Sequence, residues 1–201
     1  MRILFRKQPC LRVTIITAGI VLMVTGGIFS DALGTSPPID PVVAEGRVLM
    51  IRHAFAPGTG DPDNFSIGDC STQRNLNDQG RSQARDIGRW LRQRGFDSAR
   101  IYSSQWCRCI ETATLLGLGT VHELPALNSF FERPQDRETN LSALRDFLSK
   151  QPLDGDPIIL VTHYVTIAGV TGEGVSSGEG VMLRLTGDGG FEVLGRLPFD
   201  N

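Results

Sequence analysis

The stretch RVLMIRHA, residues 47–54, decides the fold. Its four consecutive apolar residues, 48–51, are typical of a strand buried on both faces of a parallel sheet. The run ends directly at Arg52 and His53, which places two residues capable of chemistry at the carboxyl end of the strand. Ligands of open parallel sheets bind outside the carboxyl ends of the strands. We therefore expect a functional site at this point of the chain.

The chain after residue 47 alternates short apolar runs with stretches of helical periodicity, and it contains no internal repeats. This alternation predicts an α/β fold, a three-layer sandwich with a mostly parallel central sheet, helices on both faces and a C-terminal hairpin. Further strands are expected at residues 99–102, 121–127 and 157–162, helices at 78–94, 107–116 and 139–150, and the hairpin at 182–185 and 191–194.

The N-terminal 32 residues read as a targeting segment. Four basic residues precede an uncharged apolar run over 13–29, and small residues at Ser30 and Ala32 have the spacing of a cleavage site. The segment is a signal peptide or an N-terminal membrane anchor, and the pattern leaves open whether it is cleaved. Residues 33–46, with three prolines, predict a flexible leader to one domain at 47–201. We expect an exported protein, periplasmic or anchored through residues 13–29 and facing outward.

The composition limits the partners that the domain can have. A formal net charge of -2 and a pI near 5.9 provide no global basic field, so no nucleic-acid partner is expected. Three cysteines follow the leader, at positions 70, 107 and 109, and an exported protein can form disulfides. One pair with one free thiol and three buried apolar side chains are both consistent with the sequence. The partner of Cys70, Cys107 or Cys109, is left open, as is the oligomeric state.

Four motifs occur in one order along the chain: IRHA at 51–54, LNDQGRSQA at 76–84, SSQWCRCIETA at 103–113 and VTH at 161–163. Three of them carry polar residues at expected strand ends. With these motifs the sequence resembles the histidine phosphatase superfamily, also called phosphoglycerate mutase-like, over residues 47–197. The resemblance implies a phosphatase that acts on a small phosphorylated substrate.

The resemblance also implies roles for four residues. His53 would be the nucleophile, with one ring nitrogen attacking phosphorus while the other holds its proton against a backbone carbonyl. Arg52 and Arg108 would clasp the phosphoryl oxygens, since a guanidinium fork matches phosphate geometry. His163 would donate a further hydrogen bond to the transferring group. These charges can replace a metal ion, so neither a cofactor nor a metal is implied.

The general acid is the point at which the family pattern breaks. The family commonly places Glu two residues after a Leu that follows the third strand, whereas Leu127 here is followed by Ser129. Glu132 is the nearest carboxylate beyond it, and we expect it to protonate the leaving oxygen. The alternative is that Glu132 is a solvated loop residue beside Arg133.

Other departures affect residues near the two histidines. The usual Gly after the nucleophile is Ala54, and Tyr164 stands where another branch of the family has Asp. Asp61 and Glu179 are weaker candidates for the acid. The loop at 56–62 contains two glycines that would let its backbone approach a phosphate, and we place Thr59 in the substrate site, although such loops are often plain turns. His122 matches no motif and is expected to be an ordinary residue.

Three hypotheses about the function of this site are consistent with these residues. The favoured one is an exported phosphomonoesterase with a phosphohistidine intermediate, acting on a small phosphorylated metabolite or an envelope component. A non-catalytic phospho-ligand-binding module on the same fold is the alternative, and a carboxylate in the pocket would discriminate against it. A metal site built from His53, His163 and an Asp is disfavoured, because Arg52 and Arg108 would place fixed cations beside the metal.

Overall fold

The computed structural model describes residues 46–199. The predicted targeting segment and the leader up to residue 45 lie outside this range. Within it, one sheet contains six strands: β1 (Arg47–Arg52), β2 (Arg100–Ser103), β3 (Val121–Glu123), β4 (Ile158–Thr162), β5 (Gly180–Leu185) and β6 (Phe191–Leu197). None of the helices in this part of the chain has both the length and the apolar character needed to cross a membrane.

The sheet has the strand order β3-β2-β4-β1-β5-β6. The pairs β1–β4, β2–β4 and β2–β3 are parallel, and β5 and β6 form the predicted hairpin along the other side of β1. In the register of β1 and β4, Arg52 lies opposite Thr162. The residues that follow them, His53 and His163, therefore leave the sheet side by side, as the sequence predicted for converging strand ends.

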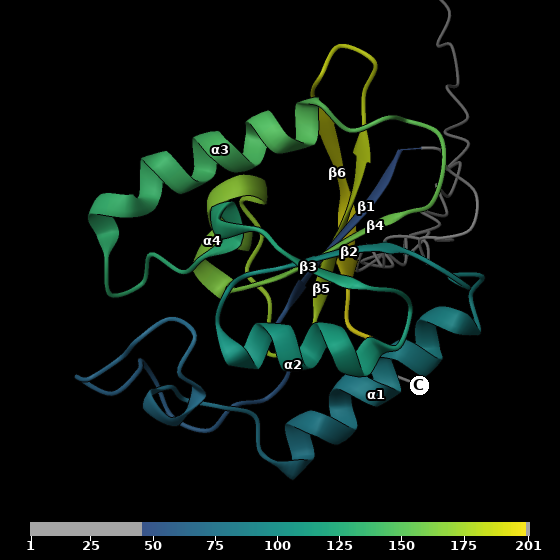
Figure 1. Cartoon of the computed structure of the whole chain (residues 1–201). Coiled ribbons are helices and arrows are strands. Elements are labelled where there is room, and N and C mark those ends of the chain that lie inside the picture. Colours follow the sequence, from purple (N-terminus) through teal and green to yellow (C-terminus); the bar gives the residue numbers. More distant parts are fainter. Residues whose placement is uncertain (1–45, 200–201) are drawn as a thin grey trace, which may run out of the picture. The chain divides into compact units, whose positions relative to one another are not determined.

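Four α-helices cover the sheet: α1 (Asp78–Arg92), α2 (Cys107–Leu116), α3 (Arg137–Ser149) and α4 (Tyr164–Thr171). Figure 1 shows α1 and α2 on one side of the sheet and α3 and α4 on the other. The core follows this division, because alternate residues of β1 pack on opposite faces: Leu49 and Ile51 against α1 and α2, Val48 and Met50 against α3 and α4. The predicted three-layer α/β fold is confirmed.

The first helix, α1, begins where the sequence predicted and packs closely on its neighbours. Its N-cap Asn77 accepts a hydrogen bond from the Gly80 N–H at 2.9 Å, which satisfies a donor of the first turn. A Cβ on Gly80 would lie 2.0 Å from the Phe55 carbonyl oxygen, and one on Gly88 would lie 2.1 Å from that of Leu116. Glycine is thus required at both positions for α1 to approach the chain after His53 and the end of α2.

Two predictions of secondary structure are corrected. The strand expected at 121–127 ends at Glu123, and Pro125–Leu127 forms a 3-10 helix, because Pro125 has no N–H with which to continue the ladder. Helix α4 was not predicted. Its sequence, YVTIAGVT, is rich in β-branched residues and has no polar stripe, so neither propensity nor periodicity identifies it.

Candidate active site

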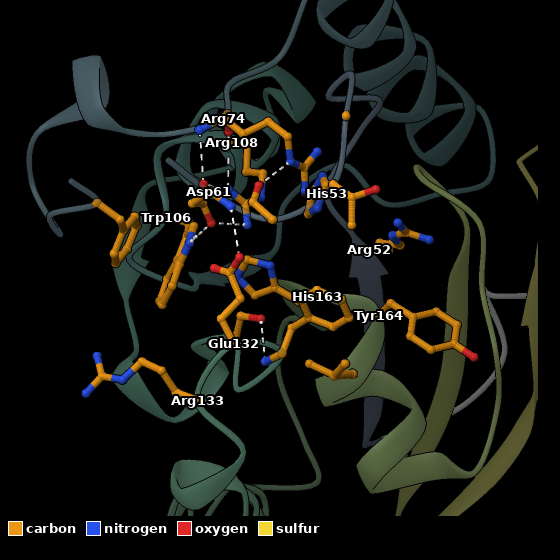
Figure 2. A pocket seen from close by; sticks show the side chains of 17 residues that line it. Arg52, His53, Asp61, Arg74, Trp106, Arg108, Glu132, Arg133, His163 and Tyr164 are labelled. Carbon is orange, nitrogen blue, oxygen red and sulfur yellow. Dashed lines mark hydrogen bonds and ion pairs between the residues drawn. The ribbon is translucent and has the colours of Figure 1, made fainter. Parts of the chain in front are cut away.

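A cavity of about 190 Å3 opens at the carboxyl edge of the parallel strands. Figure 2 shows side chains from β1, α2, α4 and the connecting loops pointing into it. All the predicted site residues line it: Arg52, His53, Thr59, Arg108, Glu132 and His163. We call the buried or half-buried lining at the strand ends and the start of α2 the floor: Arg52, His53, Arg108 and His163. The rim consists of the lining residues on the loops 55–76 and 128–134.

His53 is buried at the end of β1, with its ring oriented by its own backbone neighbour. Its Nδ1 lies 2.8 Å from the Ala54 carbonyl oxygen, which can only accept, so Nδ1 carries the proton. Burial lowers the pKa of His53 to about 3, an effect that the Ala54 hydrogen bond opposes and Arg108 reinforces. The ring is therefore neutral at physiological pH. Its Nε2 has no hydrogen-bond partner among residues 46–199 and holds a lone pair suited to attack an electrophile.

His163 is buried at the end of β4, and its ring stands edge-on to that of His53, with 5.5 Å between the ring centroids. Its Nε2 lies 2.8 Å from the Ser104 Oγ, and its Nδ1 has no partner in the described part of the chain. Burial lowers the pKa of His163 well below its ordinary value, and the neighbouring His53 and Arg108 lower it further. The floor thus contains two neutral imidazoles.

Arg108 lies in the first turn of α2 and forms a buried bidentate ion pair with Asp61. The two N–O distances are 2.7 and 3.1 Å, and each side chain is only 4% exposed. Asp61 also accepts hydrogen bonds from the Arg74 backbone N–H and the Trp106 indole. Burial alone would raise the pKa of Asp61, but these hydrogen bonds lower it below the usual value. Asp61 is therefore a fixed anion that orients Arg108, and the prediction of it as a reserve proton donor is wrong.

Arg74 is a third cation at the cavity that the motifs did not identify. Its Nε donates to the Gly60 carbonyl at 2.8 Å and its Nη1 to the Ala56 carbonyl at 2.6 Å, so it holds the loop after β1 in place. Burial lowers the pKa of Arg74, and the nearby charge of Arg108 acts in the same direction. One feature of the sequence could have identified Arg74 as a site residue: it is the only Lys or Arg between Arg52 and Arg81.

The charged side chains that line the cavity have a small net positive charge. Arg52 donates from Nη1 to the Val175 carbonyl at 3.0 Å, and its guanidinium lies 5.6 Å from the centre of the Tyr164 ring. Together with Arg74, Arg108 and Arg133 it gives four guanidinium groups, and subtracting the carboxylates of Asp61 and Glu132 leaves two positive charges. The Nε atoms of Arg52 and Arg108 are buried without an acceptor among residues 46–199.

Glu132 lies on the rim, where its carboxylate meets the loop after β1 (Figure 2). Its Oε1 accepts a hydrogen bond from the Asp61 backbone N–H at 3.3 Å. A Cβ on Gly60 would lie 2.4 Å from that oxygen, so a side chain at position 60 would displace it. Glu179, the other reserve candidate, is outside the cavity lining and pairs with Arg196 at 2.8 Å. The structure therefore leaves Glu132 as the free carboxylate of the cavity lining.

Two residues of the motifs support the floor from behind. Thr112 Oγ1 accepts from the Ala54 N–H at 3.0 Å and donates to the Arg108 carbonyl at 2.7 Å, which joins the end of β1 to α2. Gln83 accepts from the Phe55 N–H at 2.8 Å. The motif similarity in α1 and α2 is thus explained by contacts that fix the chain directly after His53. His122, which matched no motif, lies exposed on β3.

A disulfide joins Cys70 to Cys107 and leaves Cys109 free and buried. It links the loop that carries Asp61 and Arg74 to the residue before Arg108. This decides between the pairings that the sequence left open. Cys109 lies 3.5 Å from the His163 Nε2, and burial raises the pKa of its thiol to about 12.

The model of the histidine phosphatase superfamily, branch 1, matches residues 48–136. A search of curated protein sequences gives no match.

Similar folds occur among solved structures of phosphatases. One is the protein histidine phosphatase SixA complexed with tungstate, at 17% identity and a TM-score of 0.54, covering 75% of this chain and 96% of that one. A mycobacterial glucosyl-3-phosphoglycerate phosphatase with VO3 has 16% identity and a TM-score of 0.53, covering 73% and 96%. A mutant phosphoserine phosphatase from Entamoeba histolytica with phosphoserine has 14% identity and a TM-score of 0.56, covering 77% and 98%.

At these identities the structural matches establish the fold, and the sequence model adds the motifs of the site. The matched segment includes His53, Arg108 and the motif residues that support them. Residues 48–136 thus match the histidine phosphatase superfamily, and the fold of the described residues is that of the similar phosphatase structures.

Proposed function

We propose that the chain is an exported phosphomonoesterase that hydrolyses a small phosphorylated metabolite or envelope component through a phosphohistidine at His53. The observation that carries this proposal is the state of His53, a neutral ring whose Nδ1 is held by a carbonyl and whose Nε2 is free beside Arg52 and Arg108. The oxyanions bound by two of the similar structures, tungstate and VO3, are consistent with a phosphoryl site on this fold.

In the first step, His53 Nε2 attacks phosphorus and the bond to the ester oxygen breaks. Glu132, in its protonated form, gives its proton to the departing alkoxide, so that an alcohol leaves. In the second step, Glu132 takes a proton from water as the water oxygen attacks phosphorus. The P–N bond breaks, inorganic phosphate forms, and both side chains return to their starting states.

The charge of the cavity suits a monoester. Phosphomonoesters carry a charge close to -2 at neutral pH, since their second pKa is about 6. The four guanidinium groups of the lining and the carboxylates of Asp61 and Glu132 leave two positive charges, which match this dianion.

The alternative of a non-catalytic binding module is weakened by Glu132. A module that only binds phosphate gains nothing from a carboxylate at the cavity, because that charge repels the ligand. Glu132 nevertheless lines the cavity and is held there by the Asp61 N–H. The position suits a group that must alternate between donating and accepting a proton.

Export is supported by two independent features. The basic flank and the apolar run over 13–29 have the composition of a targeting segment. The Cys70–Cys107 disulfide is of a kind that persists in oxidising compartments and is rare in the cytosol.

The test is to incubate the purified protein with a panel of phosphomonoesters, with and without a chelator, and to quench with labelled substrate present. We expect turnover that chelation leaves unchanged, because the arginines supply the positive charge, and an acid-labile label on the protein. Binding of phosphate esters without turnover across the panel would instead establish the binding module. If turnover is lost in chelator and returns when a divalent ion is added, the metal-site hypothesis would be favoured.

A further inference from the structure

Ser104, the residue after β2, is the hydrogen-bond partner of His163. Its side chain is fully buried, and its Oγ lies 2.8 Å from the His163 Nε2. Ser104 does not line the cavity, so it reaches the reaction centre only through the histidine. None of the roles above uses this contact.

The hydroxyl of Ser104 has one proton and two acceptors within reach. One is the His163 Nε2 at 2.8 Å, and the other is the Asn128 Oδ1 at 3.2 Å. Hydrogen bonds from a hydroxyl to oxygen are usually 2.5–3.0 Å long, so the second contact is long. The Asn128 oxygen also already accepts from the Gln105 backbone N–H at 2.9 Å. The geometry therefore places the Ser104 proton on His163.

The second neighbour of the same nitrogen leads to the same result. Cys109 Sγ lies 3.5 Å from the His163 Nε2, and its buried thiol keeps its proton. A protonated thiol is a weak donor and a poor acceptor. Its proton can also be donated to the Thr162 carbonyl oxygen, 3.7 Å from Sγ, so Cys109 offers Nε2 no good acceptor and Ser104 remains the main donor to this nitrogen.

A neutral imidazole that accepts at Nε2 carries its proton at Nδ1. The Nδ1 of His163 has no partner in the described residues and belongs to a ring that lines the cavity beside His53. In this tautomer the cavity receives an N–H donor for a phosphoryl oxygen. In the other tautomer a lone pair would face the anion and repel it.

We propose that Ser104 is a positioning residue that selects the Nδ1–H tautomer of His163, so that His163 donates a hydrogen bond to the transferring phosphoryl group. The catalytic consequence rests on the proposed phosphatase function, whereas the tautomer is a property of the protein without substrate.

The direct test is nitrogen NMR of the folded protein labelled at histidine. The chain has three histidines, and a His122→Gln variant removes the one outside the cavity. We expect the His163 Nδ1 to be protonated and Nε2 to show the shift of an unprotonated ring nitrogen. In Ser104→Ala this preference should weaken or reverse. A protonated Nε2 in the wild type, or an unchanged signature in Ser104→Ala, would overturn the proposal.

Ser103→Ala is the matched control. Ser103 is the neighbouring serine, equally buried, but its Oγ donates to the Ser104 carbonyl and does not contact His163. We expect Ser104→Ala to lower kcat by about 10-fold, less than the ~10²- to 10³-fold loss on removal of a whole donor, because the ring remains. Ser103→Ala should keep the wild-type tautomer and a nearly wild-type kcat. Equal losses in both variants would mean that Ser104 is only structural.

The two proposals fail in different ways. If the protein hydrolyses no phosphomonoester, the phosphatase function fails, while the NMR result still decides the tautomer. In that case the affinity for tungstate, measured by calorimetry, replaces kcat: Ser104→Ala should weaken it and Ser103→Ala should not. Equal affinity in the wild type and Ser104→Ala would then overturn the donor role.

Discussion

The floor and the rim of the cavity are built from different kinds of chain. Arg52, His53 and His163 stand at or beside the ends of paired strands, and Arg108 begins a helix packed on that sheet. Glu132 and Asp61 stand on loops that are joined by a hydrogen bond from the Asp61 backbone N–H to the Glu132 carboxylate. Phosphoryl transfer needs donors that are already oriented, which the floor provides. We expect the rim to face the variable group of the proposed substrate.

The floor and the rim also differ in the interactions that keep them rigid. The floor is held by the sheet and the buried hydrogen bonds of Thr112 and Ser104. The rim is held by the Asp61–Arg108 ion pair, by Arg74 and by the Cys70–Cys107 disulfide. Changes to the floor should therefore affect every substrate alike, while changes to the rim should depend on the substrate or on the redox state.

The largest effect is expected from the floor. His53→Ala removes the nitrogen that we propose forms the phosphoenzyme, so turnover and the acid-labile label should both disappear while the fold is retained. His163→Ala removes one hydrogen-bond donor and should lower kcat by ~10²- to 10³-fold while the label persists. Steady-state rates and label trapping on both variants check this ranking. Undiminished turnover in folded His53→Ala would refute the covalent route.

Glu132→Gln should give the next largest effect, and only on some substrates. Alkyl phosphates with high-pKa leaving groups should slow by about 10²- to 10⁴-fold, because their oxygen must be protonated as it departs. Aryl phosphates should be affected far less. The ratio of kcat/KM for the two substrate types is the measurement. Equal losses on both would mean that Glu132 only shapes the rim, and no loss on either would mark it as a solvated residue.

The smallest effect on turnover is expected from the disulfide. Replacing Cys70 and Cys107 together by Ser opens a link across 37 residues, which should lower the free energy of unfolding by roughly 4 kcal/mol. At temperatures where the variant remains folded, KM should rise several-fold and kcat should change little, because the floor stays on the sheet. Denaturant unfolding and steady-state kinetics measure both. As a control, reductant should give the wild type the stability and KM of the variant and should leave the variant unchanged. Equal stability of the wild type and the variant would show that the loop is held without the disulfide.

Much of the floor could be predicted from the sequence. The run 48–51 indicates a buried strand, the register of parallel strands brings His53 next to His163, and the motif around Arg108 gives the third element. The strand and the motif each depend on a local signal, either a continuous apolar run or a pattern within one element. The approach of the two histidines follows from the rule that the carboxyl ends of parallel strands meet at one edge of the sheet. Helix α4 shows the limit, since β-branched residues without a polar stripe give no helical signal.

The sequence alone therefore determined the fold class, the edge of the sheet that bears the site, and four of its polar residues. Only the tertiary structure decided that Asp61 pairs with Arg108 across 47 positions, that Ser104 meets His163 across 59, and that Cys70 joins Cys107. Such contacts produce no periodic pattern in the sequence, because they depend on the path that each loop takes after the strands have paired. In the sequence, a loop carboxylate that donates a proton cannot be distinguished from one that is held as an anion by an ion pair. Its burial and its partners make the difference, and these exist only in the folded molecule.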